Sequence, residues 1–255
     1  MSRILLTGFE PFGAHAVNPT SAIVEQLRGE RIGGYEVIGR VLPVELDGLP
    51  ERVERLLDET APALVLNLGL AAGTPAIRLE RVALNLADFD LPDNSGANCV
   101  DQPLLPSAPE GLMSTLPLRA MLTALLTAGI PAYLSNSAGT YLCNAAMYYF
   151  LHVLRLRGRM VPCGFMHVPA LPEQVAASLI EHGVLAESGL RLELASMSLD
   201  VQLKAVRIAL QSCCNTNHAV IQPRKRNVRA QRGRLNSFST CRACAAETAS
   251  ILLHF

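Results

Sequence analysis

Residues 63–70, ALVLNLGL, contain a single polar side chain, that of Asn67. A short run that is apolar throughout is typical of a parallel β-strand that helices cover on both faces. Immediately before it, the apolar residues of 49–60, LPERVERLLDET, fall on one face of a helix. This succession of an amphipathic helix and a buried strand predicts an α/β fold.

The same alternation of strands and helices continues outward along residues 1–211. Asn18 and Pro19 open one helix with an N-cap residue followed by proline at the first helical position. The pattern predicts a three-layer α/β/α sandwich with a mostly parallel central sheet. Strands are predicted over 3–12, 35–44, 63–70, 80–89, 131–138 and 160–168, and a long loop over 93–117. Helices are predicted over 18–30, 49–60, 117–129, 172–183 and 198–211, with one more after Cys143.

Composition excludes several classes of protein. Aromatic residues make up only 5% of the chain and tryptophan is absent, so a stacking surface for nucleic acid is not expected. The N-terminus lacks the apolar core of a signal peptide, and no apolar run is long enough to span a membrane. We therefore expect a cytoplasmic protein that binds neither nucleic acid nor membranes, whose seven cysteines are free thiols.

Charge separates the last 44 residues from the rest of the chain. Residues 1–211 carry 15 Lys and Arg against 21 Asp and Glu, whereas residues 212–255 carry 7 against 1 and show no helical or strand period. We predict a catalytic domain over 1–211 and a basic, disordered extension over 212–255, which a shifted reading frame could also produce. A chain ending at Gln211 is then expected to keep its fold and activity.

The extension allows two other interpretations. Its cysteines and histidine could bind zinc, and its arginines could contact phosphates. The only regular spacing is one short CxxC, so we expect no metal, no cofactor and a solvated tail. The candidate ligands are Cys213, Cys214, His218, Cys241 and Cys244.

Three residues of the catalytic domain could form a nucleophilic triad. Cys143 begins a helix, where free N–H groups and the helix dipole favour a thiolate and could bind an oxyanion. His167 ends a strand that Pro169 stops, and Glu80 opens the predicted strand 80–89. A thiol, a base and an orienting carboxylate are the parts of a cysteine hydrolase. By spacing alone, Cys143 could equally be a core residue, and neighbouring aspartates compete with Glu80 for the third role.

Several motifs of this sequence resemble, in order, those of the pyroglutamyl peptidases, or pyrrolidone-carboxylate peptidases. The resemblance extends from about Arg3 to Gln211 and is most specific around the nucleophile. The motifs are TGFEPFG (7–13), NPT (18–20), LERVALNLADFDLPDN (79–94), NSAGTYLCN (136–144), GFMHVP (164–169) and SMSLDVQLKAVRIAL (196–210).

The resemblance implies an intracellular cysteine exopeptidase that removes N-terminal pyroglutamate from peptides and assembles into a dimer or tetramer. It places the nucleophile on Cys143, the base on His167 and the carboxylate on Glu80. The resemblance and the chemistry of a flat, neutral lactam together imply a pocket from the GFEPFG loop and the residues beside the nucleophile. The pocket residues are Phe9, Phe12, Asn18, Leu70, Tyr141 and Leu142, although Asn18 could equally act only as a helix cap.

Two positions depart from the family pattern. Asp90 stands where several members carry an arginine near the reaction centre, and Leu70 stands where some carry glutamine. A carboxylate near a developing oxyanion lowers activity unless Asp90 points away or pairs with Arg78 or Arg81. Alternative functions are therefore a cysteine amidase acting on another small lactam or acyl amide, and a weakly active or inactive relative that acts as a binding protein.

Overall fold

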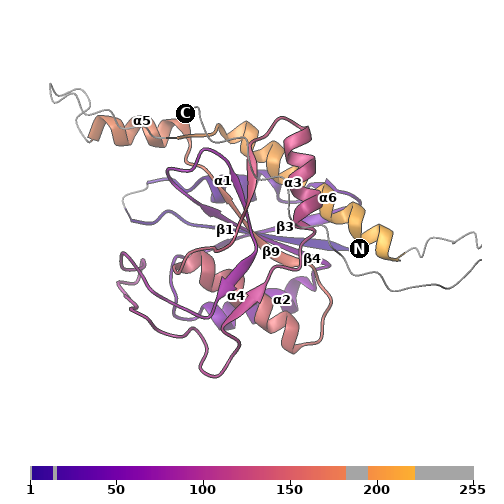
Figure 1. Ribbon diagram of the computed structural model, residues 1–255, viewed down its shortest axis with the longest axis horizontal. Helices are drawn as coiled ribbons and strands as arrows, with labels where there is room; N and C mark the ends of the chain where they lie inside the picture. The colour runs from indigo at the N-terminus through magenta and orange to yellow at the C-terminus, as the bar shows by residue number, and fades with distance from the viewer. Residues whose placement is uncertain (1, 14–15, 182–194, 222–255) are drawn as a thin grey trace, which may run out of the picture. The chain divides into compact units, whose positions relative to one another are not determined.

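A seven-stranded sheet forms the centre of the protein, as a computed structural model that describes residues 2–13, 16–181 and 195–221 shows (Figure 1). Neighbouring strands are parallel except at two places, where β2 pairs with β3 and β5 pairs with β9. The predicted mostly parallel sheet is thereby confirmed. In spatial order the strands are β2 (Arg31–Ile32), β3 (Tyr35–Leu42), β1 (Arg3–Phe9), β4 (Leu64–Leu70), β9 (Cys163–Val168), β5 (Ile77–Glu80) and β8 (Ala132–Ser135).

Helices cover both faces of this sheet, which confirms the three-layer α/β/α sandwich (Figure 1). One hydrophobic cluster lies between the sheet and α1 (Pro19–Leu27), α3 (Leu118–Thr127) and α6 (Leu199–Ile221). The other lies between the sheet and α2 (Leu49–Thr60) and α4 (Leu142–Leu156). The remaining helix, α5 (Pro172–Glu181), follows β9.

The stretch that predicted the fold lies at the middle of the sheet. All seven residues of β4 are buried, as expected of a strand covered on both faces. Its polar residue is satisfied inside the core, because Asn67 Oδ1 accepts from Thr7 Oγ1 at 2.7 Å and Asn67 Nδ2 donates to Gly164 O at 3.0 Å. These two bonds tie β4 to both of its neighbours, β1 and β9.

The single strand predicted over 80–89 is wrong. Glu80 is the last residue of β5, and after Arg81 the chain leaves the main sheet to form β6 (Val82–Leu84). β6 pairs antiparallel with β7 (Gly111–Met113), which lies inside the stretch predicted as a loop. The alternating pattern does indicate extended chain. However, β5 of the main sheet and β6 of a second, two-stranded sheet follow each other there without a turn signal between them.

The predicted end of the last helix, at Gln211, is also wrong. Helix α6 continues to Ile221, and both Cys213 and Cys214 are buried in the cluster beneath it. Cys214 packs closely on the β2–β3 turn, because a Cβ added to Gly33 would lie 2.5 Å from the Cβ of Cys214. The compact unit runs to Gln222. The predicted disorder of the extension concerns residues 222–255, which lie outside the described residues, as do the candidate ligands Cys241 and Cys244.

Truncated chains test whether the folded unit ends at Gln211 or at Gln222. A chain ending at Gln222 is expected to melt at the same temperature as the full chain. A chain ending at Gln211 loses the buried Cys213 and Cys214, worth about 2 kcal/mol of apolar burial together, so its melting temperature should fall by about 4–8 °C. Thermal melts followed by circular dichroism measure both values. Equal melting temperatures for the two truncated chains would restore the boundary at Gln211.

Candidate active site

The three predicted catalytic residues come from three different elements on the face of the sheet that α4 covers. Cys143 is the second residue of α4, His167 lies on β9 and Glu80 ends β5. Gly69 of β4 is the cross-strand partner of His167, so both positions face the same side of the sheet. A Cβ placed on Gly69 would lie 2.7 Å from Cys143 Sγ. The thiol therefore occupies the space above Gly69, beside the strand position of His167.

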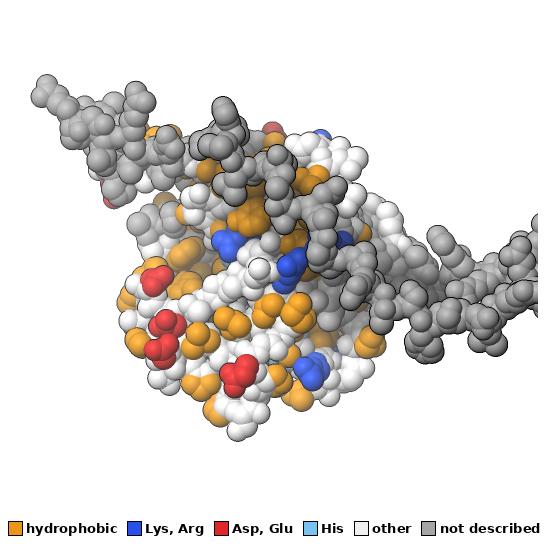
Figure 2. Space-filling view, viewed as in Figure 1, with side chains coloured by type: hydrophobic (Ala, Val, Ile, Leu, Met, Phe, Trp, Pro, Cys, Tyr) orange, Lys and Arg blue, Asp and Glu red, His pale blue; other side chains and the backbone are white. Residues whose placement is uncertain are grey.

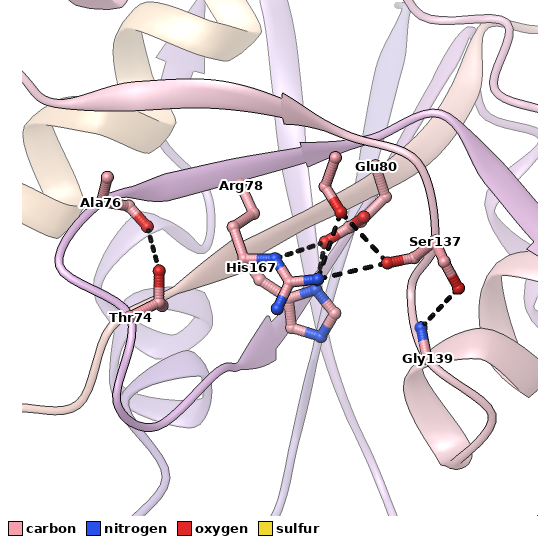
Figure 3. Close-up of polar contacts among 8 residues, drawn as sticks. Thr74, Ala76, Arg78, Glu80, Ser137, Gly139 and His167 are labelled. Carbon is pink, nitrogen blue, oxygen red and sulfur yellow. Dashed lines mark hydrogen bonds and ion pairs between the residues drawn. The ribbon is translucent and has the colours of Figure 1, made fainter. Parts of the chain in front are cut away.

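A short hydrogen bond joins the predicted base to the predicted carboxylate. His167 Nδ1 lies 2.8 Å from Glu80 Oε1, and both side chains are almost completely buried (Figure 3). Because an ionised carboxylate only accepts hydrogen bonds, Nδ1 is the donor in this contact, and in the neutral imidazole the lone pair is then on Nε2. The Phe165 ring, with its centroid 4.7 Å from that of the imidazole, supports the ring from the neighbouring position on the same face.

The surroundings of Cys143 in the folded protein oppose the expectation that the helix start and His167 hold it as a thiolate. Burial, together with the negative charge of Glu80, raises the pKa of Cys143 to about 12, although Arg78 and the backbone N–H of Cys143 lower it. The favourable helix-start position is outweighed by loss of solvent. A base must therefore remove the thiol proton as the sulfur attacks.

The start of α4 is anchored to the neighbouring β6 segment. The Asn144 side chain accepts from Leu84 N at 2.8 Å and donates to Leu84 O and Leu86 O, both at 2.9 Å. The first intrahelical bond there is from Ala145 N to Tyr141 O, so the amides before it point out of the helix end. Asn144 fixes the height and the direction of the residue before it, Cys143.

Comparison with known proteins identifies the family. Residues 2–216 match the family model described as pyroglutamyl peptidase. The chain belongs to the pyroglutamyl peptidase family. It is 42% identical over 209 residues to the pyrrolidone-carboxylate peptidase of Pyrococcus furiosus, covering 82% of this chain and 96% of that protein. It is 50% identical over 172 residues to that of Deinococcus radiodurans, covering 67% of this chain and 79% of that one.

Solved structures of pyroglutamyl peptidases share the fold. The crystal structure of the pyrrolidone carboxyl peptidase from P. furiosus matches with a TM-score of 0.78 at 41% sequence identity, over 84% of this chain and 99% of that one. A second structure, of Pf-PCP(1-204)-C, matches with a TM-score of 0.80 at 40% identity, over 87% of this chain and 99% of that one. The resemblance of the motifs and the three-layer architecture therefore agree.

The pocket residues expected of a pyroglutamyl peptidase divide into two groups. Phe12 and Tyr141 are partly exposed, and their ring centroids lie 6.0 Å apart. The other four, Phe9, Asn18, Leu70 and Leu142, are buried. Asn18 Oδ1 accepts from Thr20 N at 3.1 Å and Thr20 Oγ1 at 2.8 Å, while its Nδ2 donates to Glu10 O at 3.0 Å. These contacts use the amide of Asn18 as a helix cap.

The two departures from the family pattern lie in different surroundings. Asp90 is exposed, and neither of the proposed arginine partners forms an ion pair with it among the described residues. Arg78 pairs with Glu80, and Arg81 Nη1 donates to Asn136 Oδ1 at 3.0 Å. Leu70 is buried at the end of β4. Asp90 therefore does not neutralise the charge of Arg78, the arginine that pairs with Glu80.

Sequence reasoning missed four residues that shape this centre. Phe89 packs edge-on against Tyr141 with a centroid distance of 4.7 Å, and Arg78 contacts Glu80. Gly69 makes room for the thiol, and Asn144 anchors the helix. Gly69 lies in ALVLNLGL (63–70) and Asn144 in NSAGTYLCN (136–144), but nothing local in the sequence indicates which long-range contact either of them makes.

Replacement of Gly69 by alanine tests the placement of the thiol. The new Cβ would lie 2.7 Å from Cys143 Sγ and 2.8 Å from the Phe165 ring, so one of them must move. We expect kcat to fall about 100-fold, because a displacement of about 1 Å has that effect on an attacking group. The free energy of unfolding should fall by about 1–3 kcal/mol. Hydrolysis of a pyroglutamyl reporter amide and a thermal melt measure the two effects.

The matched control is Gly111→Ala in the two-stranded sheet, where the added Cβ makes ordinary contacts no closer than 3.4 Å. This variant should turn over at the native rate. Native kcat in Gly69→Ala would mean that the thiol does not react from the space above β4.

Proposed function

We propose that this pyroglutamyl peptidase family member is a cysteine exopeptidase that releases N-terminal pyroglutamate from peptides. The observation that carries the proposal is the buried His167–Glu80 pair on the sheet face where the thiol of Cys143 lies above Gly69. The contact with Glu80 orients the imidazole so that Nε2 is the nitrogen available to take a proton, and a thiol whose pKa is raised needs such a base. These are the requirements of a nucleophilic triad.

The reaction begins when Cys143 Sγ attacks the carbonyl carbon of the pyroglutamyl residue. His167 Nε2 takes the thiol proton, and the electron pair of the carbonyl moves to oxygen, which the free N–H groups at the start of α4 stabilise. When the tetrahedral intermediate collapses, the C–N bond breaks and His167 gives its proton to the leaving amine. The products of this half-reaction are a thioester on Cys143 and a shortened peptide.

Water completes the cycle. His167 removes a proton from a water molecule as its oxygen attacks the thioester carbonyl, and the C–S bond breaks while the proton passes to sulfur. Pyroglutamate leaves and the neutral thiol is regenerated. Glu80 stays ionised throughout and stabilises the imidazolium that forms twice in each turnover.

The lactam ring has no free amine, so its pocket needs apolar walls rather than an acidic group. Phe12 and Tyr141 are partly exposed aromatic residues, Tyr141 directly precedes α4, and the Phe89 ring packs edge-on against Tyr141. Tyr141 Oη donates to Pro92 O at 3.2 Å, which fixes the ring in place. We propose that the two exposed rings contact the lactam, and that Phe9, Leu70, Leu142 and Asn18 shape the pocket from within the core.

A panel of reporter amides tests the substrate assignment. Pyroglutamyl amide should be hydrolysed, while prolyl amide, which carries a charged amine, and alanyl amide, which lacks the ring, should be cleaved at least about 100-fold more slowly. Equal rates on all three would contradict the specificity. Hydrolysis of other small lactam or acyl amides in preference to the pyroglutamyl compound would favour an amidase, and no hydrolysis would favour a binding protein.

We also propose that the protein works in the cytoplasm as a homo-oligomer, a dimer or a tetramer. In the described ranges, no helix has both the length and the apolar character needed to cross a bilayer.

Exposed apolar side chains support the proposed assembly. Met113, Leu156 and Met160 are 62%, 73% and 98% exposed, and the two methionines line one cavity of about 850 Å³. On the face in Figure 2 the hydrophobic side chains are dispersed among charged ones. Light scattering measures the number of subunits directly.

A further inference from the structure

Arg78 is the direct cross-strand neighbour of the proposed base. In the antiparallel pairing of β5 with β9, Arg78 lies opposite His167, and Glu80 lies two residues further along the same strand. Residues directly opposite each other, and residues two apart on a strand, face the same side of a sheet. The two long side chains of β5 therefore reach the imidazole from the same face, which is the face of the nucleophile.

The Arg78 guanidinium joins two parts of the reaction centre. Its Nε lies 3.2 Å from Glu80 Oε1, the same oxygen that accepts from His167 Nδ1 (Figure 3). Its Nη2 donates to Ser135 Oγ at 3.1 Å and to Ser137 O at 3.2 Å. Ser135 and Ser137 begin the segment that leads to Cys143, so one side chain contacts both the carboxylate and the approach to the nucleophile.

Charge makes this contact more than a tether. Glu80 is completely buried, and a buried carboxylate without an opposite charge is strongly unfavourable. Within the described part of the chain, neither Glu80 Oε2 nor Arg78 Nε has a hydrogen-bond partner, so Arg78 acts on Oε1 as an ion pair beside the hydrogen bond from His167. The pKa of Cys143 responds to both residues, because Glu80 raises it and Arg78 lowers it. Arg78 therefore offsets, at the thiol, the field of the carboxylate that the base requires.

We propose that Arg78 is a positioning residue of this reaction centre, which fixes Glu80 beside His167, ties the segment before Cys143 to β5 and places a positive charge on the sheet face where the thiol lies. The proposal rests on the roles proposed above for Cys143, His167 and Glu80. It assigns to the cation an effect on sulfur reactivity that a purely structural ion pair would not have.

Alkylation of Cys143 by iodoacetamide, followed by mass spectrometry of its peptide, measures thiol ionisation without turnover. At one mildly alkaline pH, Arg78→Met should be alkylated about three- to tenfold more slowly than the native protein. Its kcat on pyroglutamyl amide should fall about 10- to 100-fold with KM within about twofold. Arg78→Lys, which keeps the charge without the planar fork, should recover the alkylation rate but only part of kcat.

The matched control is Arg81→Met. Arg81 also tethers the segment before the nucleophile, through Asn136, but it does not pair with Glu80. This variant should match the native protein in both measurements. Equal alkylation rates for Arg78→Met and Arg81→Met would overturn the proposal, whether or not Arg78→Met melts at a lower temperature. If alkylation of Cys143 leaves peptidase activity intact, the proposed nucleophile fails instead, and the comparison of the two alkylation rates remains readable.

Discussion

The Cys143→Ala variant is expected to hydrolyse pyroglutamyl amide at least about 10⁴-fold more slowly than the native protein, because no other group can form the acyl-enzyme. Its fold should persist, since the side chain is partly exposed and the substitution removes only its sulfur atom. Initial rates with the reporter amide measure the loss, and a thermal melt measures the fold. Activity within about tenfold of native would end the cysteine mechanism.

A second cysteine provides the control for this loss. Cys99 is also partly exposed and free, but it lies in the loop between β6 and β7, outside the elements that carry the three catalytic residues. Cys99→Ala should therefore retain native kinetics. Burial and Glu80 raise the pKa of Cys143 to about 12. At pH values below that pKa, the rate of its alkylation by iodoacetamide should therefore rise about tenfold for each unit by which the pH is raised.

The His167→Gln variant is expected to lose about 10³- to 10⁴-fold in kcat with little change in KM, because the base acts on protons that move only during reaction. Glutamine keeps much of the volume against Phe165, and Arg78 still pairs with Glu80, so the buried carboxylate keeps a partner. Steady-state kinetics on the reporter amide give both parameters. A change confined to KM would assign His167 to substrate binding instead.

The control for the base is His152, which lies in the same helix as the nucleophile. Its ring stacks on that of Tyr148 at a centroid distance of 5.8 Å, and it lies nine residues after Cys143 in α4. His152→Gln should leave kcat unchanged. The kcat of Glu80→Gln should lie between those of His167→Gln and His152→Gln, because an orienting carboxylate contributes less to catalysis than the base that it holds.

The parts of the fold that the sequence predicts are those with local signals. The apolar run of β4 indicates a buried strand whatever its neighbours, and Asn18 with Pro19 indicates a helix start through one short-range hydrogen bond. The end of α6 carries no such signal. Its boundary was placed by charge, yet Cys213 and Cys214 are buried because the β2–β3 turn, more than 170 residues earlier, packs on them.

The candidate site divides in the same way. Residue types and family motifs point to Cys143, His167 and Glu80, but they do not show that Glu80 ends a strand antiparallel to that of His167. That reversal places Arg78 opposite the base, and no local pattern indicates it. The acidity of Cys143 likewise depends on residues brought close by the fold, because burial and Glu80 raise the pKa of the thiol while Arg78 lowers it.

The most direct test of the central claim is labelling by a pyroglutamyl chloromethyl ketone, which carries the lactam and an electrophile at the place of the scissile carbonyl. The label should attach once per chain, to Cys143, in step with loss of peptidase activity, while the prolyl analogue should leave both unchanged. Peptide mass spectrometry locates the label. Complete loss of activity with the label on any residue other than Cys143, or without any covalent label, would contradict the account.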